Sequence, residues 1–246
     1  MHKQSPALFQ SLAVICAYVL IRGWVYHCFP VTSVESWFWR DTLMSAPRLG
    51  AFSVLLFLNR HESAVRFDLP ARDFGKAALL GFVPVALWAF YFSGGTGAAY
   101  TRTMMFIGLF TSLIVGAFEE YAYRGPLLFA LRQRLSLFAS IAVSSLIFTV
   151  YHFQAQSLRM WGAIFLAGVI FANLRFRGLS LGWLALIHGI ADAFLFFFPS
   201  GNPDPFRFYG LVLHAGLLGY AIVTFPRSHL TERKSGPSVV QTGLEH

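Results

Sequence analysis

The sequence predicts an all-α membrane protein, built as a bundle of about eight transmembrane helices. Two observations predict this class. Of the 246 residues, 56% are hydrophobic and only 12% are charged, whereas a soluble domain usually has about 25% charged residues. The apolar residues also gather in segments close to the length of about 20 residues that crosses a bilayer as a helix. A single large soluble domain would need far more polar surface than this chain offers.

Eight apolar segments are the predicted spans. They cover residues 7–26, 44–59, 77–93, 104–123, 136–156, 160–174, 179–198 and 206–225. The first resembles a signal peptide, but no small-residue cleavage site follows it and further spans do, so we expect it to be retained. The sequence therefore predicts one integral-membrane domain over residues 1–225 and a polar, disordered cytoplasmic tail over residues 226–246.

Loop charges predict the orientation of these spans. With a cytoplasmic N-terminus, the outer side and nearby span ends hold six basic residues, which are Arg22, Arg40, Arg48, Arg102, Arg159 and Arg207. The remaining 13 of the 19 lysines and arginines fall on the inner side. The positive-inside rule then places both termini in the cytoplasm and favours an even number of spans. A compact chain without an evident organelle signal is expected in a bacterial inner membrane.

The basic excess and the cysteines exclude other classes. The 19 basic residues outnumber the 11 acidic ones, but they do not cluster with aromatic residues on a polar face, so nucleic acid is not an expected partner. Cys16 and Cys28 belong to no metal-ligand spacing, and no disulfide framework is expected. The sequence gives no indication of the oligomeric state.

The predicted fourth span ends in ionisable residues within the stretch GAFEEYAYRG. Glu120 and Arg124 are four residues apart, so they share a helix face and can pair. Glu119 points about 100° away from Glu120 and has no local partner. Charged groups at such depth are costly and usually mark function.

Two later spans carry histidines at the same spacing. Phe148 and His152 lie on one helix face, as do His188 and Asp192, which are close enough to hydrogen-bond. At about 1.5 Å per residue, Glu119 and His152 lie about 22 and 24 Å from the hairpin between their helices, so they can share one level. This requires a long helix that continues through Pro126 as a kink.

Each group also has a structural interpretation. Glu120 with Arg124 can be an ion pair at a helix end, His152 a packed histidine, and His188 with Asp192 a bridge that only stabilises the fold. Three such groups in order, at depths that match, favour a shared polar chamber.

These motifs resemble those of the CPBP family of intramembrane proteases, which includes type II CAAX prenyl endopeptidases and bacteriocin-processing or immunity (Abi) proteins. The family pattern is EExxxR, FxxxH and HxxxN, and some members carry Asp at the last position. The resemblance covers residues 104–195. It implies a supporting role for Phe148 and catalytic roles for Glu119, Glu120, Arg124, His152, His188 and Asp192.

The resemblance also implies how these residues divide the work. Glu119 would activate water, His152 would hold that water, and Arg124 would position the glutamates. His188 with Asp192 would line the place where the oxyanion develops. An ionised Asp192 cannot donate a hydrogen bond to an oxyanion, so we expect it to orient His188 instead.

The predicted function is an intramembrane endopeptidase that cuts near the C-terminus of a membrane-tethered protein or peptide, either lipidated or C-terminally anchored. Membrane lipid and this substrate are the expected partners, and no cofactor is expected. A zinc site of Glu119, His152 and His188 is the alternative, although no HExxH helix is present. The same polar cluster would also suit a proton- or ion-coupled transporter, or a non-catalytic immunity protein.

Overall fold

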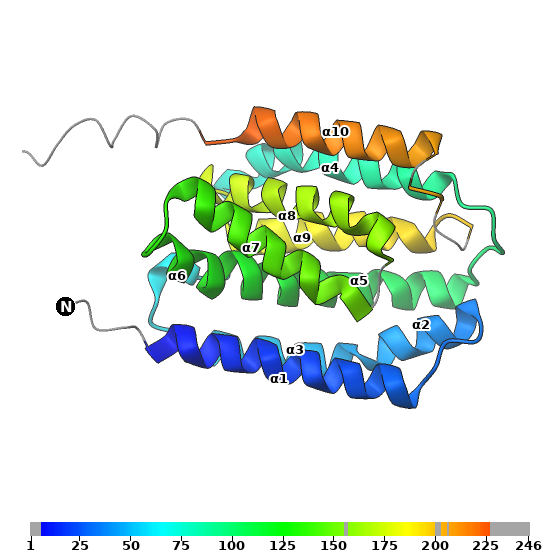
Figure 1. Cartoon of the computed structure of the whole chain (residues 1–246), viewed down its shortest axis with the longest axis horizontal. Helices are drawn as coiled ribbons and strands as arrows, with labels where there is room; N and C mark the ends of the chain where they lie inside the picture. Colours follow the sequence, from blue (N-terminus) through cyan, green and yellow to red (C-terminus); the bar gives the residue numbers. More distant parts are fainter. Residues whose placement is uncertain (1–5, 155–156, 200–202, 206, 227–246) are drawn as a thin grey trace, which may run out of the picture.

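The structure is a computed structural model that describes residues 6–154, 157–199, 203–205 and 207–226. Over these residues the chain is helical and contains no β-strand (Figure 1). The helices are α1 (Pro6–Cys28), α2 (Val34–Leu43), α3 (Ser45–Leu58), α4 (Phe74–Ser93), α5 (Arg102–Ala122), α6 (Leu128–Arg132), α7 (Leu137–Tyr151), α8 (Trp161–Phe176), α9 (Leu181–Ala193) and α10 (Phe208–Thr224). The predicted all-α bundle is confirmed.

The helices follow the eight predicted spans in order. Among the described residues, five helical segments are long and apolar enough to cross a membrane, and the segments at α7, α9 and α10 are shorter apolar helices. The second span was placed at residues 44–59, whereas the structure extends it to Val34–Leu58 by adding α2. The polar residues Glu35, Arg40 and Asp41 kept α2 from being recognised as part of an apolar segment.

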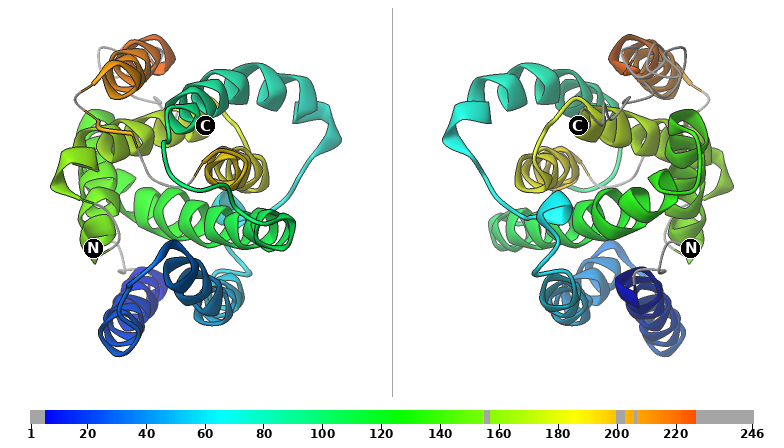
Figure 2. Two further views of the ribbon diagram at one scale, coloured as in Figure 1. Left: turned by 90° about the vertical axis from the view of Figure 1, so that its right-hand side faces the viewer. Right: turned by 90° about the vertical axis from the view of Figure 1, so that its left-hand side faces the viewer.

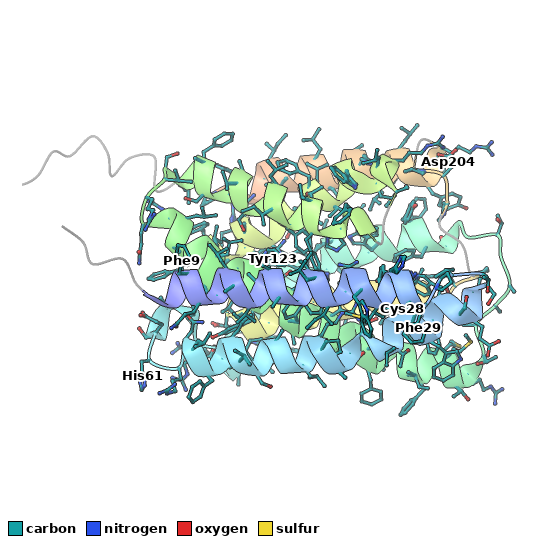
Figure 3. The ribbon with its side chains drawn as sticks, turned by 60° about the horizontal axis from the view of Figure 1, so that its bottom comes forward. Phe9, Cys28, Phe29, His61, Tyr123 and Asp204 are labelled. Atoms are coloured by element: carbon teal, nitrogen blue, oxygen red, sulfur yellow. The ribbon has the colours of Figure 1, made fainter. Side chains whose placement is uncertain are left out.

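The two ends of the bundle are distinct. Helix α1 begins and α10 ends at the same end, which we call the terminal face (Figure 1). His61 also lies there, while Phe29 and Asp204 lie at the other end, the opposite face (Figure 3). The even number of crossings predicted from the loop charges is therefore observed. Most of the predicted tail, residues 227–246, lies outside the described residues.

The motif-bearing helices occupy the middle of the bundle. Helix α5 packs against α9, and α7 packs against α8. Helices α1 to α3 cover one side of this centre and α4 with α10 cover the other (Figure 2). Helices α5 and α9 approach closely at Gly116, which has no side chain. A Cβ at this position would meet the backbone carbonyl of Ala185 and the backbone of Gly189.

Local sequence signals fix the register of these central helices. Hydroxyl side chains cap the first turns of α5, α7 and α9, where Thr101, Ser136 and Ser180 each accept a hydrogen bond from a backbone N–H three residues on. Helix α5 continues into α6 through a wide π-type turn at Tyr123–Leu127, in which Gly125 has a non-helical ψ of −110°. The kink predicted at Pro126 is therefore present.

Candidate active site

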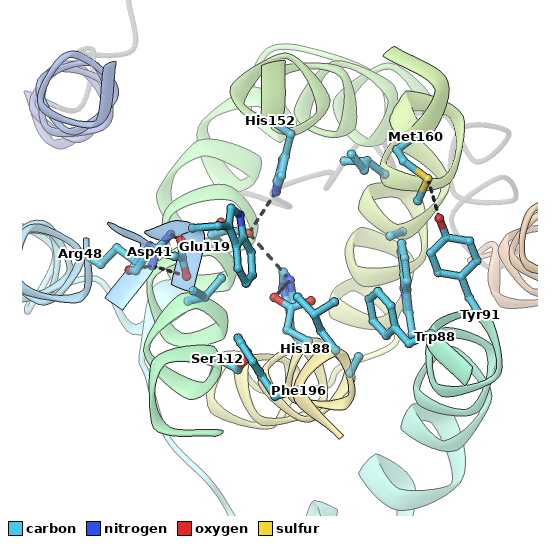
Figure 4. A pocket seen from close by; sticks show the side chains of 18 of the residues that line it. Asp41, Arg48, Trp88, Tyr91, Ser112, Glu119, His152, Met160, His188 and Phe196 are labelled. Carbon is cyan, nitrogen blue, oxygen red and sulfur yellow. Dashed lines mark hydrogen bonds and ion pairs between the residues drawn. The ribbon is translucent and has the colours of Figure 1, made fainter. Parts of the chain in front are cut away.

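Glu119 faces two histidines from other helices. Its side chain is buried near the end of α5. The Oε2 atom lies 3.7 Å from Nε2 of His152, just beyond α7, and 3.8 Å from Nε2 of His188 on α9 (Figure 4). Three residues from three separate spans thus meet at one level, as the helix rises predicted.

The gap around Glu119 suits a bound water. Its Oε2 atom is buried and has no hydrogen-bond partner in the described part of the chain. Distances of 3.7 and 3.8 Å are too long for direct hydrogen bonds. Contacts of this length are commonly bridged by water. A buried acceptor without a partner is costly, so this oxygen is a favourable place for a water molecule.

Glu120 has a different set of partners from Glu119. Its Oε1 lies 2.7 Å from Nδ1 of His188 and 3.2 Å from Nη1 of Arg124. The side chains of Glu120 and Arg124 are almost wholly inaccessible, at 0% and 1% exposed. The two consecutive glutamates therefore point apart, so that one faces the histidine pair and the other holds a histidine in place.

Hydrogen bonds at Nδ1 define the protons on both imidazoles. Nδ1 of His152 lies 2.8 Å from the carbonyl oxygen of Phe148, and a carbonyl can only accept, so this nitrogen carries the hydrogen. Nε2 of a neutral His152 is then an acceptor directed at Glu119. Nδ1 of His188 likewise donates to the Glu120 carboxylate. Its Nε2 faces the carboxylate oxygens of Glu119 at 3.8 Å and of Asp192 at 3.5 Å, so a hydrogen on this nitrogen has electrostatically favourable neighbours.

Aromatic rings fix the orientation of both histidines. The Phe148 ring lies 4.6 Å from the His152 ring, as their spacing predicted. The guanidinium carbon of Arg124 lies 4.1 Å from the centroid of the same Phe148 ring. Phe171 on α8 stacks on His188 at 5.1 Å. No motif distinguishes Phe171 in the sequence, because it is one phenylalanine among the 27 in the chain.

Asp192 lies at the edge of this cluster. Its Oδ2 atom is 3.5 Å from Nε2 of His188, and its side chain is 43% exposed, against 4% for Glu119. Asp192 thus contacts the histidine that Glu120 already holds, from the side that is open to the cavity.

The cluster lines the inner part of a cavity of about 580 Å³. Its other walls are mainly apolar and aromatic and include Trp88, Tyr91, Met160 and Phe196 (Figure 4). The lining continues to residues 31–33 and Tyr100, in loops at the opposite face. The described lining includes no residue from the loops of the terminal face. The cavity lining therefore extends toward the opposite face and not toward the terminal face.

Three charged residues of the cavity wall were not recognised as part of the site. Arg22 and Arg48 were grouped with the outer-side charges, but both are buried, at 2% and 3% exposed. Asp41 pairs with Arg48 at 2.7 Å. Their positions near span ends made them indistinguishable from loop charges in the sequence.

The zinc site of Glu119, His152 and His188 stays a prediction. Among the described residues, no group of three or more His, Cys, Asp and Glu side chains is placed to hold a metal ion. Nε2 of His188 is shared between Glu119 and Asp192, and this arrangement suits a proton between acceptors.

Together, these features define a class: an integral membrane protein with an acid–imidazole site inside its helix bundle. Residues 101–194 match the family model described as "Type II CAAX prenyl endopeptidase Rce1-like". This match spans α5 to α9 and confirms the resemblance to the CPBP protease family. This match to a protease family supports a hydrolase. No curated protein and no solved structure matches the chain at a significant level.

Proposed function

We propose that this protein is an intramembrane endopeptidase in which Glu119 activates water to hydrolyse a peptide bond. One observation carries the proposal. A buried carboxylate oxygen without a protein hydrogen-bond partner faces two imidazole nitrogens at the inner end of a cavity. The match to a protease family supports the same chemistry.

The proposed reaction begins with a water held between Glu119 and His152. Glu119 takes a proton from this water while the water oxygen bonds to the carbonyl carbon of the peptide. The oxyanion that forms is stabilised by the Nε2 proton of His188. The C–N bond then breaks, and the proton on Glu119 passes to the departing amine. The products are a new carboxylic acid and a new amine.

Glu120 and Arg124 act through His188 in this scheme. Glu120 accepts the Nδ1 proton of His188, which leaves Nε2 directed at the reacting carbonyl. Arg124 neutralises Glu120, so that the pair adds no net charge to the buried site. Asp192 also contacts Nε2 of His188 and orients the ring from the cavity side.

The position of the cavity lining supports substrate entry from one side of the bundle. The cavity lining reaches the loops of the opposite face. With both termini in the cytoplasm, as the loop charges predict, this is the outer side of a bacterial inner membrane. The substrate is then a membrane-tethered protein or peptide, lipidated or C-terminally anchored, that presents its cleavage site at the outer leaflet. The apolar cavity walls suit a hydrophobic peptide.

The test is Glu119→Gln in membranes that contain a pool of candidate substrates, with peptide termini identified by mass spectrometry. General-base catalysis contributes about 10²- to 10⁴-fold, so processing should fall by at least 10²-fold. The matched control is Glu62→Gln, since Glu62 is exposed in a loop of the terminal face. Unchanged processing by Glu119→Gln would remove the protease assignment, and loss of an ion flux instead would favour a transporter.

A zinc chelator distinguishes metal-free hydrolysis by Glu119 from zinc-dependent hydrolysis. Metal-free catalysis by Glu119 predicts that wild-type processing survives a stringent zinc chelator. Loss of processing on chelation, restored by added zinc, would require the alternative site of Glu119, His152 and His188.

A further inference from the structure

Arg22 is a buried cation in the wall of the catalytic cavity. It lies near the end of α1 and is 2% exposed. Its Nη1 donates to the carbonyl oxygen of Tyr151 at 3.3 Å. Its guanidinium carbon lies 4.5 Å from the Tyr151 ring centroid and 5.1 Å from that of Tyr26. Two aromatic faces and one carbonyl therefore hold the guanidinium at the cavity.

Arg22 differs from the other buried arginines in its lack of an acidic partner. Arg48 pairs with Asp41 and Arg124 with Glu120. Arg22 makes no ion pair with any acid in the described part of the chain, and its Nε has no hydrogen-bond partner there. An uncompensated charge at this depth is costly. Such a group is ready to pair with an anion that enters the cavity.

The neighbouring arginine is not available for this purpose. Arg48 contacts both carboxylate oxygens of Asp41, at 2.7 and 3.4 Å, and the Tyr18 hydroxyl at 3.1 Å. Its charge is neutralised and most of its donors are occupied. Arg22 is thus the buried arginine of the cavity wall that can take a new partner.

Arg22 also lies at a useful distance from the reacting groups. Its guanidinium carbon is 4.5 Å from the Tyr151 ring, which is 4.9 Å from the His152 ring. The guanidinium is therefore within about 10 Å of His152, a span that a few extended residues can bridge. Glu119 and Asp192 also line the cavity and repel an anion, so a bound peptide would have its negative end directed at Arg22.

We propose that Arg22 binds the free C-terminal carboxylate of the substrate and thereby sets which peptide bond reaches Glu119. This inference rests on the proposed endopeptidase function. It names the substrate feature as a free α-carboxylate, a few residues beyond the cleaved bond. Arg22 is a specificity-determining residue and takes no part in water activation.

The test compares free acids with amides. The probe is a library of N-palmitoylated peptides with randomised last six residues, made with a C-terminal carboxylate or a carboxamide, and supplied to the purified full chain in nanodiscs. Hydrogen bonds to charged groups imply about a ten- to hundred-fold preference in kcat/KM for the acids. Arg22→Gln should remove this preference by slowing the acids alone, and Arg22→Lys should retain part of it. Equal cleavage of acids and amides by the wild type would overturn the proposal.

Two controls separate this inference from the proposed function. Glu119→Gln should abolish cleavage of acids and amides alike, and if it does not, the endopeptidase mechanism itself fails. Arg102→Gln removes an exposed cation at the opposite face and should leave the acid preference unchanged. A loss of preference in Arg102→Gln equal to that in Arg22→Gln would assign the effect to general surface charge and overturn the role of Arg22.

A binding measurement covers the case in which Arg22→Gln does not fold. Thermal stabilisation of the Glu119→Gln chain is titrated with N-acetyl-leucyl-leucyl-phenylalanine as acid and as amide. The acid should bind at least about ten-fold more tightly. Equal binding overturns the proposal. The proposal is also overturned if the acid preference is present in neutral nanodiscs and disappears in phosphatidylglycerol nanodiscs. In that case the Arg22 guanidinium would bind the anionic lipid headgroup in place of the peptide carboxylate.

Discussion

The central and peripheral helices are similarly apolar but lie in different surroundings. Over its most apolar stretch, the span that contains α8 has 56% of its residues buried, whereas the span formed by α2 and α3 has 17%. Outward side chains such as Phe9, Leu79 and Phe82 are at least 70% exposed on the peripheral helices. Hydrophobicity alone therefore identifies the spans but does not identify the centre. The positions of the polar groups do that.

The largest expected effect concerns a buried ion pair at the centre. Arg124→Leu leaves the carboxylate of Glu120 buried without its cation. Removing one partner of such a pair costs about 3–5 kcal/mol, and His188 would lose its fixed orientation. We expect a loss of stability of that size and a loss of processing, measured by unfolding in mixed micelles and by product peptides.

The matched change in the periphery is Asp41→Asn. The side chain of Asp41 is 21% exposed. In this variant its partner Arg48 would still donate a hydrogen bond to the Tyr18 hydroxyl. The free-energy loss should be smaller, about 1–3 kcal/mol. If Asp41→Asn destabilised the chain more than Arg124→Leu, burial would not be what separates the two regions.

Two glycines sharpen the same comparison. A Cβ at Gly116 would meet the backbone carbonyl of Ala185 and approach the Gly189 nitrogen to 2.7 Å, whereas a Cβ at Gly50 on α3 would meet nothing within 4 Å. Gly116→Ala must therefore separate α5 from α9, at a cost of about 1–3 kcal/mol. Gly50→Ala should be neutral or stabilise by up to about 1 kcal/mol. Thermal unfolding of both variants measures the difference, and equal effects would contradict the close packing of α5 on α9.

The sequence predicted much of this fold because lipid imposes a simple rule on composition. A segment such as residues 77–93 must be apolar to cross the bilayer, so its helix was predicted within a few residues of its bounds at Phe74–Ser93. Helix α2 was missed because it carries the charged residues Glu35, Arg40 and Asp41, of which Asp41 lines the cavity. These charges lower the hydropathy of α2, although the helix is part of the second span.

The motif residues were found for the opposite reason. Glu119, His152 and His188 stand out within apolar helices, and the helical rise sets their depth. Arg22 has the same character, but it is near a span end, where basic residues usually belong to loops. Only the packing of α1 against the centre distinguishes a buried cation from a loop charge.

The smallest expected effect is at Asp192, which has the motif spacing of a central residue but the exposure of a peripheral one. If it only orients His188, the oxygen of Asn keeps the contact that Asp192 makes at 3.5 Å. Asp192→Asn should then retain processing within about ten-fold of wild type, or about 1.4 kcal/mol, as measured by product peptides. Asp192→Ala removes the contact altogether and should be slower than Asp192→Asn. If Asp192→Asn were as inactive as Glu119→Gln while the fold remained stable, the carboxylate itself would be required for catalysis, and exposure would be a poor guide to function within this cavity.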